Sequence, residues 1–324
     1  MTSICSIIIV THNRADDLAK ALASLGKCAQ IEACELIVVE NSEETEKSRT
    51  VVEAFTGAQS VRYFTTDDRS LAKSRNLGAR AAQGQLLCFF DDDMRFGAQT
   101  LAAYIAGAEK YGEGHFFGGP LVANAEVSPA FWLRSHLPPS ALGFGLGEAE
   151  KAVTEASFLG GNCCFFREML LAIGGFPEYL GTTENYPALA EETVLQSRLI
   201  AKGHSGIYLP EATVMHGVPA DNCSRSFALH RSYRLGLSQT LIRHVEENLP
   251  APKRAPMWML RNWAELKLLI GLKKLLSRPQ EQIFPDEIAR EHQRGVFDGL
   301  KYLRKLNLVA RYGPTNGLDS QANG

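Results

Sequence analysis

Short apolar segments alternate with helix-like segments along the first part of the chain. The apolar segments lie at residues 4–10, 36–39, 61–64 and 86–90. They recur roughly every 25 residues, a spacing that leaves room for one helix between strands and is typical of parallel strands joined by helical crossovers. We therefore predict an α/β fold in which a mixed, mostly parallel sheet is flanked by helices.

Polar residues follow three of these predicted strands. His12 and Asn13 follow the first, Glu40 and Asn41 the second, and three consecutive aspartates the fourth. Because the carboxyl ends of parallel strands meet at one edge of a sheet, and ligands bind at that edge, we expect the ligand cleft there.

The three aspartates, Asp91, Asp92 and Asp93, are the strongest sign of a binding site. Three adjacent carboxylates repel one another, and a divalent cation would relieve the repulsion. Such oxygen ligands suit Mg²⁺ or Mn²⁺. Because side chains alternate in extended backbone, Asp91 and Asp93 are expected to face one way and Asp92 another. The alternative is a solvated acidic turn that caps a helix near Gly97.

Composition indicates a globular protein that is kept in a reducing compartment. The 324 residues are 45% apolar and 22% charged, with a net charge of -2. From Ala251 onward, however, 13 Lys and Arg face 7 Asp and Glu. The seven cysteines lack the spacing of a disulfide framework. With no signal peptide or transmembrane segment recognised, the expected location is cytoplasmic.

Two stretches of the chain lack periodicity. Residues 126–153 are rich in Pro and Gly and carry Phe131 and Trp132, which either belong to a lid or binding loop or pack as ordinary core residues. Residues 176–189 form the second irregular stretch. We expect acceptor contacts from both.

Four sequence segments together resemble family 2 glycosyltransferases of the GT-A fold, which is Rossmann-like. They are IIIVTHNR at 7–14, LAKSRNLG at 71–78, FDDD at 90–93, and a final stretch that runs from GGN at 160–162 through GGF at 174–176 to Glu191-Glu192. The resemblance covers residues 1–220 and implies a GT-A catalytic domain there. It implies transfer of a sugar, with inversion, from a UDP-, dTDP- or GDP-sugar to a hydroxyl of a glycan or lipid-linked acceptor, as in polysaccharide or cell-envelope biosynthesis.

The resemblance also implies roles for individual residues. The general base would be Glu192, with Glu191 beside it, and the metal ligands would be Asp91, Asp93 and His216. The nucleotide would be bound by Thr11, Arg14, Glu40, Arg75, Asp91 and Asp92. Two positions depart from the family pattern: Glu40 stands where Asp is usual, and Glu191-Glu192 stands where Glu-Asp is usual. Some of these residues have an alternative role. Arg75 could form an ordinary surface ion pair, His216 could be structural, and the acids at Glu191-Glu192 could simply be favoured by the dipole of the helix that they begin.

The rest of the chain is predicted to be a helical extension at 221–317 followed by a disordered tail at 318–324. Its helices are expected at 226–244, 256–276 and 285–308. The second is rich in Trp, Met and Leu with interspersed basic residues. It either packs over the catalytic domain or makes peripheral contact, through 256–277, with anionic lipid on the inner face of the membrane.

Two other functions compete with glycosyl transfer. A sugar nucleotidyltransferase would need a glycine-rich, basic phosphate loop after the first strand, and residues 11–17 are not such a loop. A non-catalytic nucleotide- or carbohydrate-binding module would explain Glu191-Glu192 as decay of the catalytic pair. No nucleic-acid partner is expected, because basic residues do not cluster with aromatic ones on a predicted platform.

Overall fold

The computed structural model describes residues 5–43, 45–183 and 185–313. The chain divides into two compact units. The first comprises Met1–Ser128, Leu137–Tyr186 and Ala190–Cys223, and the second Pro129–His136, Pro187–Leu189 and Ser224–Gly324. The division falls at residue 224 rather than 220, and it assigns two short upstream segments to the second unit. The tail predicted to be disordered, 318–324, lies outside the described residues.

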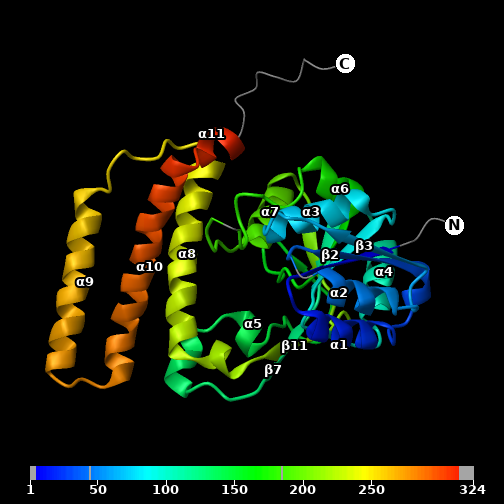
Figure 1. Ribbon diagram of the computed structural model, residues 1–324, viewed down its shortest axis with the longest axis horizontal. Coiled ribbons are helices and arrows are strands. Elements are labelled where there is room, and N and C mark those ends of the chain that lie inside the picture. The colour runs from blue at the N-terminus through cyan, green and yellow to red at the C-terminus, as the bar shows by residue number, and fades with distance from the viewer. Residues whose placement is uncertain (1–4, 44, 184, 314–324) are drawn as a thin grey trace. The chain divides into compact units, whose positions relative to one another are not determined.

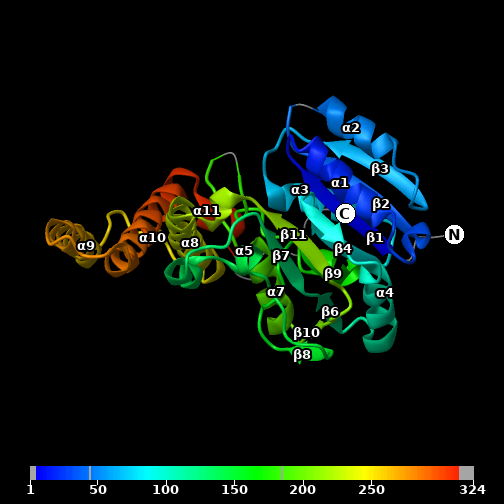
Figure 2. The ribbon, with the colours of Figure 1, turned by 90° about the horizontal axis from the view of Figure 1, so that it is seen from below.

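An eight-stranded sheet forms the centre of the first unit, in the order β3-β2-β1-β4-β9-β6-β10-β8. The four predicted strands of the first part of the chain run parallel and side by side (Figure 2), as β1 Cys5–Thr11, β2 Cys34–Glu40, β3 Ser60–Thr65 and β4 Leu86–Asp91. Beyond β4 the sheet is mixed, because β9 (Asn162–Phe166) pairs antiparallel with both β4 and β6. The remaining strands are β6 His115–Gly118, β8 Lys151–Val153 and β10 Ser205–Tyr208.

Helices cover both faces of this sheet. On β1, Ile7 and Ile9 pack in the cluster that contains Leu18 and Leu22 of α1 (Ala15–Leu25), whereas Ile8 packs on the opposite face in another cluster. This alternation follows from the two-residue period of a strand. The other helices of the unit are α2 Thr45–Glu53, α3 Leu71–Ala81, α4 Thr100–Tyr111, α5 Pro139–Leu142, α6 Arg167–Ala172 and α7 Glu191–Ala201, with short 3₁₀ turns at Ile31–Ala33 and Ala220–Cys223.

A three-stranded sheet, in the order β5-β11-β7, completes the first unit. Its strands are β5 Met94–Phe96, β7 Leu121–Ala125 and β11 Val214–Val218. Neither β5 nor β7 is predicted from the sequence, since both are short and mix apolar with polar residues. Asn162, at the start of β9, fixes this small sheet: its Nδ2 donates to the carbonyls of Pro120 (3.1 Å) and Ala212 (2.9 Å), and its Oδ1 accepts from Tyr104 (2.7 Å).

The second unit is helical. Within it α10 (Gln280–Lys305) lies between α8 (Arg225–Glu246) and α9 (Met257–Leu275), as Figure 1 shows. A 3₁₀ turn at Phe131–His136 and the short α11 at Leu308–Tyr312 complete it. Glycines let α8 and α10 approach closely, because a Cβ on Gly236 would lie 1.9 Å from the His292 carbonyl oxygen.

Two expectations about this unit need correction or refinement. The last long helix begins at Gln280, not at Pro285, which lies inside it. A proline there removes one backbone hydrogen bond, but the neighbouring Ile283 and Phe284 are buried, and their packing favours the helix. Trp132 stacks edge-on against Phe284 with ring centroids 5.1 Å apart, so it is a packing residue, whereas Phe131 is 92% exposed.

All seven cysteines are buried, and none forms a disulfide in the structure. Among the described helices, none combines the length and apolar content that crossing a bilayer requires.

Candidate active site

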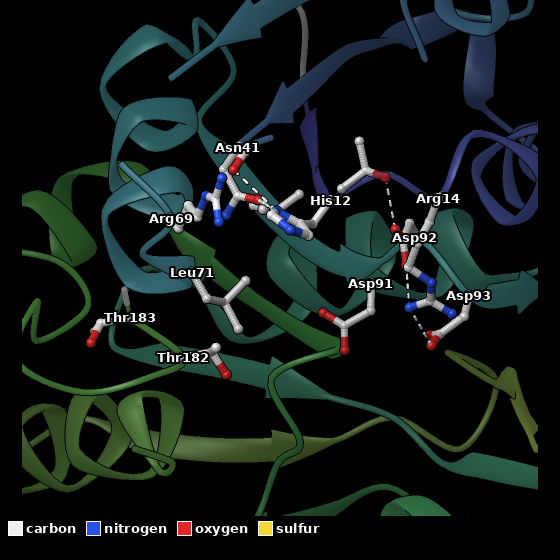
Figure 3. Close-up of a pocket in the computed structure, with 12 residues that line it drawn as sticks. His12, Arg14, Asn41, Arg69, Leu71, Asp91, Asp92, Asp93, Thr182 and Thr183 are labelled. Atoms are coloured by element: carbon white, nitrogen blue, oxygen red, sulfur yellow. Dashed lines mark hydrogen bonds and ion pairs between the residues drawn. The ribbon is translucent and has the colours of Figure 1, made fainter. Parts of the chain in front are cut away.

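A cavity of about 520 Å³ opens at the carboxyl ends of β1, β2 and β4, at the edge where the sequence predicted a ligand cleft (Figure 3). Its lining brings together residues from distant parts of the chain: Val10, Thr11, His12, Arg14, Asn41, Arg69, Leu71, Asp91, Asp92, Asp93, Thr182 and Thr183. The three aspartates therefore share a cavity with predicted nucleotide-binding residues of the first strand end.

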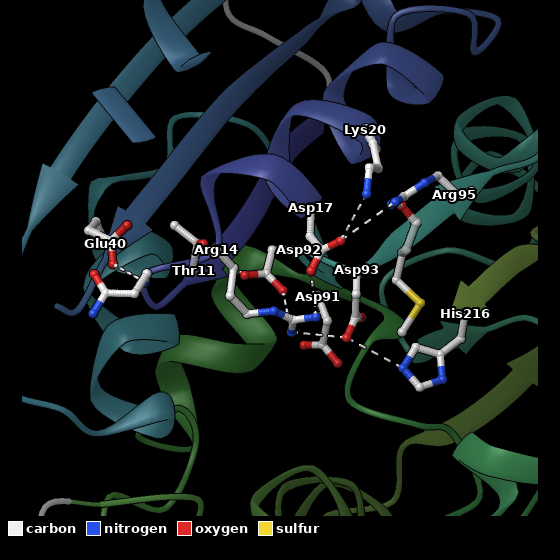
Figure 4. A network of polar contacts seen from close by, with 12 residues as sticks. Thr11, Arg14, Asp17, Lys20, Glu40, Asp91, Asp92, Asp93, Arg95 and His216 are labelled. Atoms are coloured by element: carbon white, nitrogen blue, oxygen red, sulfur yellow. Dashed lines mark hydrogen bonds and ion pairs between the residues drawn. The ribbon is translucent and has the colours of Figure 1, made fainter. Parts of the chain in front are cut away.

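Among the three aspartates, Asp92 is buried and is held by neighbouring side chains. It is 4% exposed, accepts a hydrogen bond from Thr11 Oγ1 at 2.7 Å, and lies 2.8 Å from Arg14 NH1. Burial raises the pKa of Asp92 to about 7, although Arg14 and Thr11 both favour its charged form. The same guanidinium reaches Asp93 (3.0 Å) and Asp17 (3.0 Å), as Figure 4 shows, so Arg14 neutralises several carboxylates at once.

Asp93 faces His216 across the space between the β4–β5 turn and β11 (Figure 4). Asp93 Oδ2 lies 3.4 Å from His216 Nε2, and His216 Nδ1 lies 2.7 Å from the carbonyl oxygen of Ser140. A carbonyl oxygen can only accept a hydrogen bond, so Nδ1 of His216 carries a proton. In a neutral His216, Nε2 would then present a lone pair to the Asp93 carboxylate. A proton or a metal cation must therefore lie on that side of the ring for the contact to be favourable.

The electrostatics of this pair agree with that conclusion. Burial opposes charge on both groups, but the hydrogen bond and charge of His216 lower the pKa of Asp93, and Asp93 in turn raises the pKa of His216. Asp93 Oδ1 is also buried and has no hydrogen-bond partner among the described residues. A carboxylate that has one unpartnered oxygen and lies close to an imidazole nitrogen suits a cation such as Mn²⁺.

Asp91, the third predicted metal ligand, has a different partner. Arg75 NH2 donates to Asp91 Oδ1 at 2.9 Å, and Arg75 NH1 donates to Glu191 Oε1 at 2.9 Å. Across the described residues, no three His, Cys, Asp or Glu side chains are grouped as ready metal ligands. Of the predicted set, the structure therefore brings Asp93 and His216 together, while Asp91 remains paired with Arg75.

The glycines of the 160–161 segment explain how Arg75 fits. Arg75 is 2% exposed, so the alternative of an ordinary surface ion pair is wrong. A Cβ on Gly161 would lie 2.5 Å from Asp91 Oδ2, and one on Gly160 would lie 2.9 Å from Arg75 NH1. Glycine is therefore required at both positions, because a side chain would clash with the ion pair between Arg75 and Asp91.

Glu191 and Glu192 begin α7 but have different surroundings. Glu191 is 5% exposed and is bound by Arg75. Glu192 is only partly buried and forms no ion pair with a described residue. Burial, together with the negative charge of Glu191, raises the pKa of Glu192 to about 7 against the opposing effect of Arg75. The two carboxylates therefore differ in their surroundings: Glu191 forms an ion pair with Arg75, whereas the pKa of Glu192 is raised toward neutral pH.

Glu40 is not among the residues that line the cavity. It is fully buried, its Oε1 accepts from the Asn13 backbone N–H at 3.3 Å, and its Oε2 has no hydrogen-bond partner among the described residues. Its predicted contact with a nucleotide base stays a prediction.

Other residues of the recognised motifs have structural roles. Asn76 Nδ2 donates to the Phe176 carbonyl oxygen (2.9 Å), and Asn76 Oδ1 accepts from the Phe176 N–H (2.8 Å). Gly175 has φ of 75°, and a Cβ there would lie 2.4 Å from Asn76 Oδ1. The asparagine of one motif thus holds the glycine turn of another.

Sequence reasoning missed several residues of the cavity wall. Arg69, Thr182 and Thr183 come from loops without a motif, and only the general expectation that 176–189 is a binding loop pointed toward two of them. His12 and Asn41 were visible as polar residues after strands, and the structure joins them through a 2.9 Å hydrogen bond between His12 Nδ1 and Asn41 Oδ1.

Both the sequence and the fold are similar to those of known glycosyltransferases. The chain matches the model of glycosyl transferase family 2 over residues 6–174. None of the curated proteins matches it. Among solved structures, the mannosyltransferase PcManGT from Pyrobaculum calidifontis, in complex with GDP-Man and Mn²⁺, is similar at a TM-score of 0.54 and 16% identity, over 95% of this chain and 88% of that one.

A second similar structure is GalNAc-T7 with UDP, GalNAc and Mn²⁺, at a TM-score of 0.52 and 16% identity, over 74% of this chain. The matched part spans 51% of the GalNAc-T7 chain, about half its length. At these identities the likeness establishes the fold, which confirms the predicted GT-A architecture. The family match, which covers more than half of the chain, shows that the chain belongs to glycosyl transferase family 2.

Proposed function

We propose that this enzyme transfers a sugar, with inversion, from a nucleotide-diphosphate sugar to a hydroxyl acceptor, and that Glu192 is the general base. The observation that carries the proposal is the ion pair of Arg75 with Glu191 on one side and Asp91 on the other. It places the first turn of α7 beside the acids at the end of β4, and it leaves Glu192 as the acid that is free to accept a proton.

The reaction would be a direct displacement. The acceptor oxygen forms a bond to the anomeric carbon, the bond from that carbon to the diphosphate oxygen breaks, and the acceptor proton passes to Glu192. A general base works best when its pKa lies near the working pH. The raised pKa of Glu192, about 7, suits that role, whereas Glu191 is already engaged in an ion pair with Arg75.

Asp93 and His216 are the residues we assign to a divalent cation. The unpartnered Asp93 Oδ1 and the direction of His216 Nε2 support this assignment, and water and phosphate oxygens would complete the ligand set. When bound, Mg²⁺ or Mn²⁺ would offset the negative charge that develops on the departing diphosphate. The Mn²⁺ named in both similar structures and the imidazole ligand favour Mn²⁺.

The donor is assigned to the cavity at the ends of β1, β2 and β4. Its wall offers hydrogen-bonding groups and positive charge from Thr11, Arg14 and Arg69, which suits a ribose diphosphate. The UDP and GDP-Man in the similar structures support a UDP- or GDP-sugar, with a dTDP-sugar as the third candidate. We place acceptor contacts on the loop that supplies Thr182 and Thr183, and we propose a glycan or lipid-linked acceptor.

A donor panel tests the proposal. The intact protein is incubated with UDP-, GDP- and dTDP-sugars, with and without MnCl₂, while thermal stabilisation and release of the nucleoside diphosphate are both measured. We expect one base class to stabilise the protein only with the metal and to be hydrolysed slowly. Stabilisation without any turnover would favour the non-catalytic binding module instead.

A Glu192 variant tests the base assignment separately from the donor assignment. Glu192→Gln should retain donor-dependent stabilisation and lose most turnover. Near-normal turnover by Glu192→Gln would remove the base assignment without affecting the donor assignment.

A further inference from the structure

Helix α9 exposes a stripe of large apolar side chains. We define the α9 stripe as Met257, Leu268, Leu272 and Leu275, which are 78%, 75%, 50% and 81% exposed. The three leucines are spaced by four and three residues, so they lie on one face of the helix, and Met257 lies on the same face three turns earlier. Of the residues of α9, only Met259 and Ile270 are buried.

The chain around the α9 stripe is strongly basic. Between residues 253 and 278 there are seven basic residues and one acidic residue, Glu265. Arg261 is 80% exposed at its side chain, and Lys267 Nζ lies 3.7 Å from the ring centre of Trp263. Lys273 and Lys274 contact Asp286 (2.6 Å) and Glu287 (3.0 Å) of α10. Positive charge therefore surrounds the stripe, and part of it also ties α9 to α10.

Apolar surface continues around α9 to the side that faces α10. A groove of about 1000 Å³ lies there, lined by Trp258, Leu266, Leu269, Ile288 and Val296 among others. Trp258 is 63% exposed and carries a polar N–H on an apolar ring, a combination that is favoured at the boundary between lipid and water.

We propose that α9 is a membrane-surface helix and that the α9 stripe inserts into the headgroup region of an anionic bilayer. A basic helix with exposed Trp and Leu gains both from burying apolar area and from attraction to anionic lipid. Lysine and arginine stems can lie along the apolar surface while their charged ends reach the phosphates. Flexible acyl chains also fit an irregular apolar groove, such as the one beside Trp258.

Charge decides between a bilayer and a second copy of the chain as the occupant of this surface. A symmetric dimer through the α9 stripe would place two copies of the 253–278 segment against each other, with an excess of positive charge on both sides. An anionic bilayer offers the opposite charge. Every residue that supports membrane binding lies in the second unit, so neither Glu192 nor the cation site is needed for it.

Vesicle flotation of the full-length protein is the direct test. Vesicles of phosphatidylcholine with about 30% phosphatidylglycerol are compared with pure phosphatidylcholine vesicles at about 0.1 and 0.5 M NaCl, since salt screens the charge contribution. We expect binding to the anionic vesicles at low salt, weaker binding at high salt, and little binding to neutral vesicles.

Two variants separate the apolar from the charged contribution. Leu268→Ser/Leu272→Ser/Leu275→Ser should weaken binding to anionic vesicles roughly tenfold or more, since three exposed leucines no longer insert. Arg261→Glu/Lys267→Glu should weaken it as well and remove most of the salt dependence. The matched control is Lys27→Glu/Arg80→Glu, which makes the same change in net charge at exposed positions of the first unit and should bind like the wild type.

Folding and assembly are checked on the same samples. The substituted side chains are exposed, so thermal unfolding should be nearly unchanged. Flotation that fails for the intact wild type, or that the triple serine variant retains in full, would overturn the proposal. So would sedimentation showing a wild-type dimer that the serine variant abolishes, because the stripe would then be an interface between copies.

Discussion

Arg75 and Glu191 form a 2.9 Å ion pair although 116 residues separate them in the sequence. Arg75 also binds Asp91 at 2.9 Å, so one buried guanidinium joins the acids after β4 to the acids that begin α7. The distance between the proposed leaving-group side and the proposed base side of the reaction is therefore set by one side chain.

Replacing Arg75 should destabilise the protein strongly. Arg75→Met leaves Glu191 buried without its counter-charge, and losing one partner of a buried pair reduces the free energy of unfolding by about 3–5 kcal/mol. Urea unfolding followed by fluorescence measures the change. Arg261→Met is the control: it removes an arginine from the exposed pair with Glu265 (2.7 Å) and should leave stability nearly unchanged. Equal effects of the two variants would contradict the structural role of the buried pair.

The pH dependence of turnover should depend on Glu192. Its pKa is raised to about 7, and only the deprotonated carboxylate can accept the acceptor proton, so kcat/KM should fall as pH decreases through about 7. Initial rates between about pH 5.5 and 8.5 give the profile of kcat/KM against pH. Glu192→Gln should make this profile flat, although Glu191 and Asp91 are still present in the variant. Because the pKa of Asp92 is also raised to about 7, Asp92→Asn is the necessary control. If Asp92→Asn removes the acid limb and Glu192→Gln keeps it, Glu192 is not the base.

Substitution at the proposed cation site should weaken metal binding. The variant is His216→Ala, which leaves Asp93 as the only protein ligand that we assign. The Mn²⁺ concentration needed for half-maximal binding should rise by at least about tenfold. Electron paramagnetic resonance of free Mn²⁺ reports binding independently of turnover. His204→Ala, a histidine of the first unit outside the cavity, should titrate like the wild type. An unchanged titration for His216→Ala would remove the assignment.

Two glycines of the second unit should respond in opposite directions to alanine. Gly236→Ala places a methyl group 1.9 Å from the His292 carbonyl, so α8 and α10 must separate, at a cost of roughly 1–3 kcal/mol or more. A methyl group on Gly271 of α9 would meet no neighbouring segment within 4 Å, and Gly271→Ala should stabilise its helix by roughly 0.5–1 kcal/mol. Thermal unfolding of both variants measures the difference, and a loss of stability in both would show that α9 packs differently from the arrangement in Figure 1.

Local sequence patterns predicted the parts of the fold that depend on neighbouring residues. The strands β1, β2, β3 and β4 follow from apolar runs, and the position of Asp91 at a strand end follows from the run that precedes it. Pairings across the chain could not be predicted this way. Neither the Arg75–Glu191 ion pair nor the contact of His216 Nδ1 with the Ser140 carbonyl has a local signal, because each depends on how distant segments pack.

The second unit shows a different limit of sequence reasoning. Proline at 285 suggested a helix start, but burial of Phe284 decided otherwise. In the 257–276 segment, apolar residues occur on every side of the helix, so periodicity alone could not show which side is covered. The structure identifies the uncovered side as that of Leu268, Leu272 and Leu275.

The amide of Asn162 has a consequence for anyone who wishes to redesign this enzyme. It ties together the segments that lead into β7 and β11, and β11 carries His216. An aspartate of nearly identical shape would have no hydrogen to offer two carbonyl oxygens, so even that swap would loosen the strand that presents the imidazole. Libraries aimed at a new donor should therefore vary Arg69, those aimed at a new acceptor should vary Thr182 and Thr183, and both should keep position 162 fixed.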